Sequence, residues 1–284
     1  MFDHIRNRDG KRIFAVIDYP RGKGPFSFGS KGPSPNHRFS GTGGQDRWGA
    51  VLIVHGFKGS SAQRHIQGIS DALVDAGFLT IRPDLTKNPG RSYMEFADMT
   101  YRGELEDCQE VFDYLLKMDE VDKNKIGIAG HSLAGMIVSE IAAERNEICA
   151  LAILSGVYSF KFVAEHIFSK PFQKAKKEFN QKGWTSVWSQ HLEKRLKIKR
   201  GFYEDIVQRT AGDFVGKIKC PTLVVSSGAD EAVSQNHADL WMKNLGTRDK
   251  HMEIIEGSDH NYSGEALNKV APIVANWFAD KLTK

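Results

Sequence analysis

The sequence predicts an α/β protein built on a mostly parallel sheet. From residue 51 onward, short apolar runs alternate with segments whose apolar residues recur at helical spacing. Such alternation is typical of parallel strands joined by right-handed helical crossovers. The chain has 284 residues, of which 40% are hydrophobic and 26% are charged. This is the size and composition of a globular domain with a full core, so we expect one domain that carries an insertion.

The expected strands are short and apolar. They occupy residues 12–19, 51–55, 78–84, 125–129 and 150–155, and two more begin at residues 221 and 252. Helices are expected at 62–76, after residue 97, at 136–144 and at the end of the chain, where Val270, Val274 and Phe278 share one apolar face. Pro272 either kinks that last helix or occupies its first turn.

Two stretches interrupt the alternation. Residues 20–48 are dense in Gly, Pro and Ser, a composition that predicts a long loop within the core. Residues 157–216 are helix-prone, basic and aromatic, with no strand-like run. They predict a helical lid inserted after the strand at 150–155, which is the sixth strand of the fold implied by the resemblance given below, and residues 1–156 and 217–284 then form the core. Trp184 and Trp188 would lie on one helical face of this lid, either lining a substrate pocket or packing the lid onto the core.

The net charge of +4 is unevenly distributed. Between Val157 and Arg200 there are eleven Lys or Arg residues against Glu165, Glu178 and Glu193, a balance of +8 that leaves the remainder near −4. A solvated charged face explains this pattern, and attraction of acidic substrates is the alternative. Nucleic-acid binding is not expected, because no nucleic-acid motif accompanies the charge.

The sequence also indicates where the protein is found. The first residues have no apolar core of the kind that a secretory signal needs, and no stretch approaches the ~18 apolar residues of a membrane span. Cys108, Cys149 and Cys220 are odd in number and lie in apolar contexts, which favours buried thiols over disulfides. We therefore expect a cytoplasmic protein, and a homodimer is left open.

The most informative segment is Gly130-His131-Ser132-Leu133-Ala134-Gly135. It lies between an apolar run that predicts a strand and a segment that predicts a helix. Small residues on both sides of a serine allow a sharp strand-to-helix turn that exposes the hydroxyl, and this turn is the nucleophile elbow. The pattern Gly-x-Ser-x-Gly has Ala134 in its last position here. Ser132 is therefore the candidate nucleophile, with helix capping as the alternative role.

A serine nucleophile needs a base and a carboxylate that orients the base. Asp230 ends a small-residue turn after one predicted strand, and His260 lies in the loop after the next. Their order along the chain, Ser, Asp, His, is the order expected for this elbow. His260 is the candidate base and Asp230 the candidate acid, with Glu231 and Asp213 as alternatives for the acid.

The fourth part of such a site holds the negative oxygen of the tetrahedral intermediate. A strand leads into His55-Gly56-Phe57. The backbone N–H groups of Phe57 and Leu133 are the expected donors of this oxyanion hole.

These motifs together resemble the α/β-hydrolase family along nearly the whole chain. Within it, the sequence looks most like lid-bearing carboxylesterases such as cinnamoyl or feruloyl esterases, and like the serine aminopeptidase and monoglyceride lipase group. Residues 84–92 replace the Arg-Gly-His-Gly run that many relatives carry after this strand. That loop often shapes the substrate entrance, so the substrate itself is not carried over from the resemblance.

The predicted function is hydrolysis of small carboxylic esters, including feruloyl-type aryl esters, through an acyl-enzyme. A peptidase or amidase of the same fold is the alternative, and a non-catalytic ligand binder is a second one. No cofactor is expected, and no residues have the spacing of a metal site. No motif in the sequence identifies the physiological ester or the acyl or aryl group that the enzyme prefers. The lid residues that line the pocket are not identified by a motif either.

Overall fold

The computed structural model describes residues 1–21, 47–190 and 192–283. Most of the predicted 20–48 loop lies outside these residues, and Trp48 itself begins a strand. The strands are β1 (Phe2–Arg6), β2 (Arg12–Asp18), β3 (Trp48–Val54), β4 (Leu79–Asp84), β5 (Val121–His131), β6 (Ala150–Leu154), β7 (Trp184–Ser189), β8 (Lys194–Lys199), β9 (Thr222–Ser227) and β10 (Lys250–Ile255).

The helices are α1 (Arg64–Asp75), α2 (Tyr101–Lys117), α3 (Leu133–Glu144), α4 (Phe160–Phe168), α5 (Phe172–Lys182), α6 (Arg200–Ile206), α7 (Gln235–Asn244) and α8 (Glu265–Leu282). Short 3-10 turns lie at Phe96–Asp98, Ala211–Asp213 and Val215–Lys217. Pro272 lies inside α8, which continues past it, so the proline does not occupy the first turn.

The described strands form an eight-stranded sheet in the order β1-β2-β4-β3-β5-β6-β9-β10. Two neighbouring pairs at one edge are antiparallel, β1 with β2 and β2 with β4. The other neighbouring pairs of this sheet are parallel. This is the mostly parallel sheet that the sequence predicts. The edge strand β1 was not expected, because its residues are mostly exposed and lack an apolar run.

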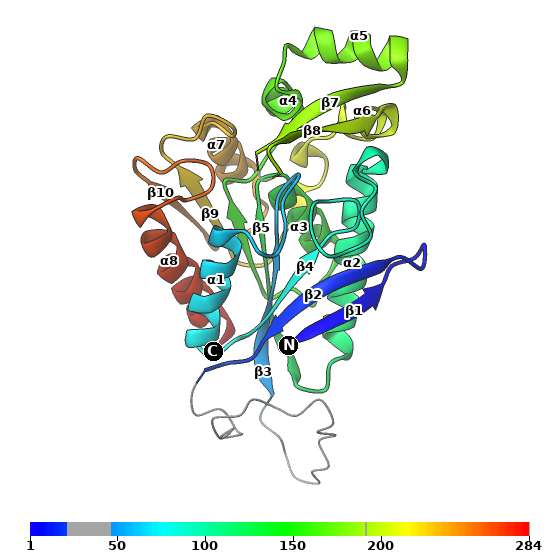
Figure 1. Cartoon of the computed structure of the whole chain (residues 1–284). Helices are drawn as coiled ribbons and strands as arrows, with labels where there is room; N and C mark the ends of the chain where they lie inside the picture. Colours follow the sequence, from blue (N-terminus) through cyan, green and yellow to red (C-terminus); the bar gives the residue numbers. More distant parts are fainter. Residues whose placement is uncertain (22–46, 191, 284) are drawn as a thin grey trace.

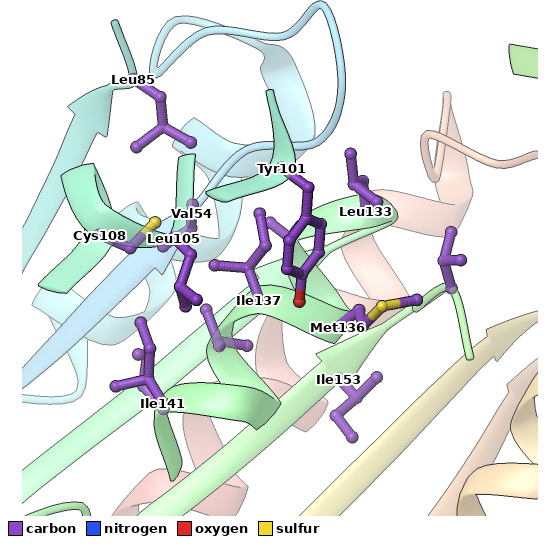
Figure 2. Packing of buried hydrophobic residues seen from close by; sticks show 14 of the residues in the cluster. Val54, Leu85, Tyr101, Leu105, Cys108, Leu133, Met136, Ile137, Ile141 and Ile153 are labelled. Carbon is purple, nitrogen blue, oxygen red and sulfur yellow. The ribbon is translucent and has the colours of Figure 1, made fainter. Parts of the chain in front are cut away.

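Two layers of helices cover the sheet. Successive side chains of a strand point to opposite faces, so Val51 and Ile53 of β3 join one apolar core while Leu52 and Val54 join the other. α1 and α8 lie together over the first face, and α2 and α3 over the second (Figure 1). Figure 2 shows Leu105 and Cys108 from the first turns of α2 near Ile137 of α3 in this second core.

The expected insertion follows β6, but it is not a purely helical lid. Between β6 and β9 the chain forms α4 and α5, then the antiparallel hairpin β7–β8, and then α6. The prediction of an all-helical segment with no strand was wrong, because the alternation of apolar and charged residues in Lys194–Lys199 is a strand pattern of period two. The insertion lies over the end of the sheet where the parallel strands finish (Figure 1).

Two further predictions concern the cysteines and membrane-spanning helices. All three cysteines are free thiols, of which Cys108 is buried while Cys149 and Cys220 are only half-buried. Within the described ranges, no helix combines the length and apolar character needed to cross a membrane.

Candidate active site

Ser132 lies at a sharp turn between β5 and α3, as the elbow motif predicts. Its backbone has φ 58° and ψ −121°, a conformation that a non-glycine residue adopts only when its surroundings enforce it. Close packing around the turn does so: a Cβ on Gly130 would lie 2.4 Å from the carbonyl oxygen of Ala134, and one on Gly56 would lie 2.8 Å from Cβ of Ser132. The glycines are therefore required sterically, while position 134 accommodates alanine.

Ser132, His260 and Asp230 are joined by two hydrogen bonds. Ser132 Oγ lies 2.9 Å from His260 Nε2, and His260 Nδ1 lies 2.8 Å from Asp230 Oδ2. Asp230 follows β9 and His260 follows β10, so parallel strands bring residues far apart in sequence to one edge of the sheet. An ionised carboxylate only accepts hydrogen bonds, so Nδ1 of His260 carries the proton and Nε2 accepts from the serine hydroxyl.

Asp230 is held in place by its own turn. Its Oδ1 accepts hydrogen bonds from the N–H groups of Ala232 and Val233, each at 2.8 Å. Burial raises the pKa of the Asp230 carboxyl, but the hydrogen bond and charge of His260 and the two N–H donors outweigh it, so this pKa lies below its ordinary value. The alternatives Glu231 and Asp213 are both exposed, and the contact with His260 Nδ1 belongs to Asp230.

The turn that holds Phe57 is fixed by a buried histidine. His55 Nε2 accepts a hydrogen bond from the N–H of Leu85 at 3.1 Å, so its Nδ1 carries the proton and donates to the carbonyl of Gly56 at 2.9 Å. Burial lowers the pKa of His55 and keeps the ring neutral. Neither Phe57 nor Leu133 donates its N–H to another described residue in a loop, turn or cap contact. Phe57 and Leu133 both line the space beside Ser132, and their role as oxyanion donors stays a prediction.

His131 has a role that the sequence did not indicate. Its Nε2 lies 2.8 Å from the backbone carbonyl of His260, to which it donates. Its ring also packs against those of His65 and His260, with centroids 4.3 Å and 4.7 Å away. Burial lowers the pKa of His131 well below its ordinary value, so the ring is neutral. A histidine beside the nucleophile was the only sequence signal, and it does not reveal a contact with residue 260.

The loop of His260 has a second anchor in Tyr262. Its hydroxyl accepts a hydrogen bond from Ser155 at 2.9 Å and donates to the carbonyl of Val225 at 3.3 Å. Tyr262 and Ser155 both have positive φ, at 53° and 42°, so this buried contact joins two tightly bent loops. It ties the loop after β10 to the ends of β6 and β9.

A cavity of about 380 Å³ opens beside Ser132. The core supplies Phe57, Ser132 and His260 to its wall, and the insertion supplies Ile167, Trp188 and other residues. Trp188 lies on strand β7 of the hairpin, and 43% of its surface is exposed. We call this space the Ser132 cavity.

Only one of the two tryptophans suggested for substrate binding lines this cavity. Trp188 does, while Trp184 lies elsewhere on β7, near the ammonium groups of Lys182 and Lys197 at 5.7 Å and 4.9 Å from its ring centre. Both lie on a strand, so the expected shared helical face is wrong. Across the described ranges, no cluster of three or more His, Cys, Asp or Glu side chains is arranged to hold a metal ion.

Comparisons with known proteins agree with this architecture. Residues 69–284 match the model of the prolyl oligopeptidase family. An uncharacterised 31.7 kDa protein of the traX-finO intergenic region of Escherichia coli is 23% identical, over 82% of this chain and 91% of that protein.

Two solved structures extend the comparison. Est1E from Butyrivibrio proteoclasticus with ferulic acid bound is 26% identical, with a TM-score of 0.76 over 99% of this chain and 100% of that one. The esterase domain of a Rhodothermus marinus protein is 18% identical, with a TM-score of 0.69 over 99% and 98% of the two chains. The chain therefore belongs to the prolyl oligopeptidase family and is a hydrolase of α/β-hydrolase fold.

Proposed function

We propose that this protein is a serine carboxylic-ester hydrolase that works through an acyl-enzyme. The observation that carries the proposal is the continuous relay from Ser132 through His260 to Asp230, at 2.9 Å and 2.8 Å, beside a cavity. A hydroxyl in such a relay is activated for attack on a carbonyl.

The relay defines the proton movements. His260 Nε2 takes the hydroxyl proton as Ser132 Oγ attacks the ester carbonyl, and then gives it to the departing alcohol. Asp230 keeps the imidazole in the required tautomer and stabilises its charged form. A water molecule, activated by His260 in the same way, then attacks the acyl-serine and releases the acid.

The negative charge develops on the carbonyl oxygen of the substrate. The amides of Phe57 and Leu133 would receive this oxygen, because both residues line the cavity beside Ser132 and neither N–H has a partner in a described loop, turn or cap. Each donor of this kind lowers the barrier by on the order of 3 kcal/mol. The mechanism uses only protein groups and water.

The cavity supports a small substrate. Its volume of about 380 Å³ is at the lower end of the 300–1,000 Å³ range of small-molecule sites. Its wall combines apolar side chains such as Ile167 and Val163 with the ring of Trp188. The ferulic acid bound to Est1E supports aryl esters as a candidate class, since that protein shares the fold over its whole length.

Peptide hydrolysis is the second candidate, because the matched family model is that of prolyl oligopeptidases. The relay serves both reactions, and an amide differs only in the leaving group that His260 must protonate. The small volume of the cavity favours an ester of a small acid over a folded or extended polypeptide.

Paired substrates decide between these functions. A p-nitrophenyl ester and the p-nitroanilide of the same acyl group should be compared, together with hydroxycinnamate methyl esters and prolyl p-nitroanilides. We expect ester kcat/KM to exceed anilide kcat/KM by at least about a hundredfold, since binding energy is matched and only the leaving group differs. A prolyl anilide cleaved as well as its ester would establish the peptidase instead.

A fluorophosphonate probe separates both enzymes from a ligand binder. The probe should label the wild-type protein on Ser132, and Ser132→Ala should not react. Ser159→Ala is the matched control, because the Ser159 hydroxyl makes no capping bond at the start of α4. A folded wild-type protein that is not labelled would establish the non-catalytic alternative.

A further inference from the structure

Lys58 follows Phe57 in the turn that holds the expected oxyanion donor. Its backbone has φ 62°, and its N–H donates to Oδ1 of Asn88 at 3.0 Å. The residue is therefore fixed in an unusual conformation, and it lines the Ser132 cavity. A lysine held this way beside a reaction centre is placed to contact whatever occupies the cavity.

The ammonium group of Lys58 has no carboxylate partner. Nζ donates to the backbone carbonyl of Trp188 at 2.8 Å and lies 5.1 Å from the ring centre of Phe57. None of the ion pairs among the described residues includes Lys58. The described residues that line the cavity likewise include no Asp or Glu.

Two lysines of the insertion have the carboxylate partner that Lys58 lacks. Lys170 pairs with Glu178 at 2.9 Å, and Lys199 pairs with Asp98 at 2.5 Å. Burial without such a partner lowers the pKa of Lys58 to about 8. A cation that is desolvated and unpaired costs free energy, which an incoming anion would recover.

The neighbouring titratable groups add no negative charge inside the cavity. His131, His166 and His260 share its wall with Lys58. Burial is the main cause that lowers the pKa of His166; the charges of His260 and Lys58 lower it further, and the charges of Asp230 and Glu231, which lie outside the cavity wall, oppose this shift. On the hairpin, Arg195 of β8 pairs in register with Trp188, so the adjacent strand is cationic as well.

We propose that Lys58 is a specificity-determining residue that binds an ionised carboxylate on the substrate, so that the preferred esters carry a second acidic group. This inference rests on the proposed ester hydrolysis. An ammonium with one protein acceptor retains N–H groups for a carboxylate, and charge-assisted bonds of this kind are the strong ones in a partly dry site.

The first test compares two esters of nearly equal shape. p-Nitrophenyl adipate monoester carries a terminal carboxylate, and p-nitrophenyl 6-methylheptanoate has an isopropyl group in its place. A second pair places the charge on a ring, with methyl 4-carboxycinnamate against methyl 4-isopropylcinnamate. The readout is the ratio of kcat/KM for the anionic to the neutral ester.

Lys58→Met should lower this ratio about tenfold or more in at least one pair, because a hydrogen bond between charged groups is lost. Lys58→Arg should retain most of it. Lys161→Met is the matched control: it removes one charge from an exposed position of α4 outside the cavity wall. A ratio that changes equally in Lys58→Met and Lys161→Met would overturn the inference in favour of long-range attraction by the insertion.

The pH dependence gives a second signature. The wild-type ratio should fall as the pH rises through about 8, where Lys58 loses its charge, while Lys58→Met should show a flat ratio. Any effect of pH on the shared reaction centre acts on both esters alike and cancels in the ratio. A wild-type ratio that stays constant across this range contradicts a role for Lys58.

A binding measurement separates this inference from the proposed function. Calorimetry with Ser132→Ala compares adipate with 6-methylheptanoate, without any turnover. We expect tighter binding of adipate, and loss of that preference when Lys58→Met is added. If the protein prefers adipate but hydrolyses no ester, the proposed function is wrong and the carboxylate site stands. If the protein hydrolyses esters but shows no preference for adipate, only the inference about Lys58 is wrong.

Discussion

The side-chain carbonyl of Asn88 accepts a hydrogen bond from the backbone N–H of Lys58, at 3.0 Å. The amide of the same side chain donates to the buried carboxyl of Glu104 in α2, at 2.6 Å. Asn88 therefore connects the turn of the expected oxyanion hole to the body of the protein. It lies in the 84–92 loop, whose sequence differs from the Arg-Gly-His-Gly run of many relatives.

Replacement of Asn88 by leucine should impair both stability and turnover. The change leaves Glu104 and the Lys58 N–H without their partner, which costs about 1–3 kcal/mol of unfolding free energy. A shifted turn would misplace the Phe57 amide, so kcat should fall more than KM rises. Urea unfolding and ester kinetics measure the two effects. Asn244→Leu, at an exposed position, is the control, and an Asn88→Leu enzyme with normal kcat would show that the turn needs no such support.

Asp230→Asn should reduce kcat/KM for a p-nitrophenyl ester by about 10⁴-fold, because an amide no longer enforces the tautomer of the base. Asp230 is the carboxylate that contacts His260 Nδ1. The neighbouring variants Glu231→Gln and Asp213→Asn alter exposed residues and should retain activity. A loss of activity seen only in Glu231→Gln would mean that Glu231, and not Asp230, is the acid of the relay.

Glu104 should make the stability of the protein depend on pH. Burial raises the pKa of this carboxyl from 4.5 to about 8, so the folded state binds a proton that the unfolded state has released. The stabilisation is fully present below pH 4.5 and is lost as the pH rises toward about 8, with a slope of at most about 1.4 kcal/mol per pH unit.

Glu104→Gln tests this assignment, since glutamine keeps an acceptor for Asn88 and cannot ionise. The variant should show a flatter profile of unfolding free energy against pH than the wild type. Asp107 also has a raised pKa, so some slope should remain. Superimposable profiles of the two proteins would mean that Glu104 is not the group that titrates.

Much of the fold and of the candidate relay could be predicted from local sequence patterns. The apolar runs of the parallel strands and the Ser132 turn are contiguous in sequence, so they were predicted from the residues themselves. Lys58 and His131 were missed because their partners, Trp188 and His260, are 130 and 129 residues away. The hairpin was missed because its charged residues obscured a period of two: in β8 only Leu196 and Ile198 are buried.

The hairpin β7–β8 provides a test of substrate choice that spares the relay. Its two ends are close, because the N–H of Arg200 donates to the carbonyl of Gly183 at 2.9 Å. Residues 184–199 can therefore be replaced by a short glycine linker, while Ser132, Asp230 and His260 remain on the ends of the main sheet. The deletion removes Trp188 and part of the cavity wall.

We expect the shortened enzyme to lose far more kcat/KM for bulky aryl and long acyl esters than for p-nitrophenyl acetate, because only the larger substrates reach the missing wall. Removal of the buried Val187 and Ile198 should lower stability, so the melting temperature must be measured before the kinetics are compared. Trp188→Ala is the milder variant and should shift selectivity in the same direction with little change in folding. Equal losses for small and large esters in a folded deletion variant would mean that the hairpin supports the reaction centre generally and does not select the substrate.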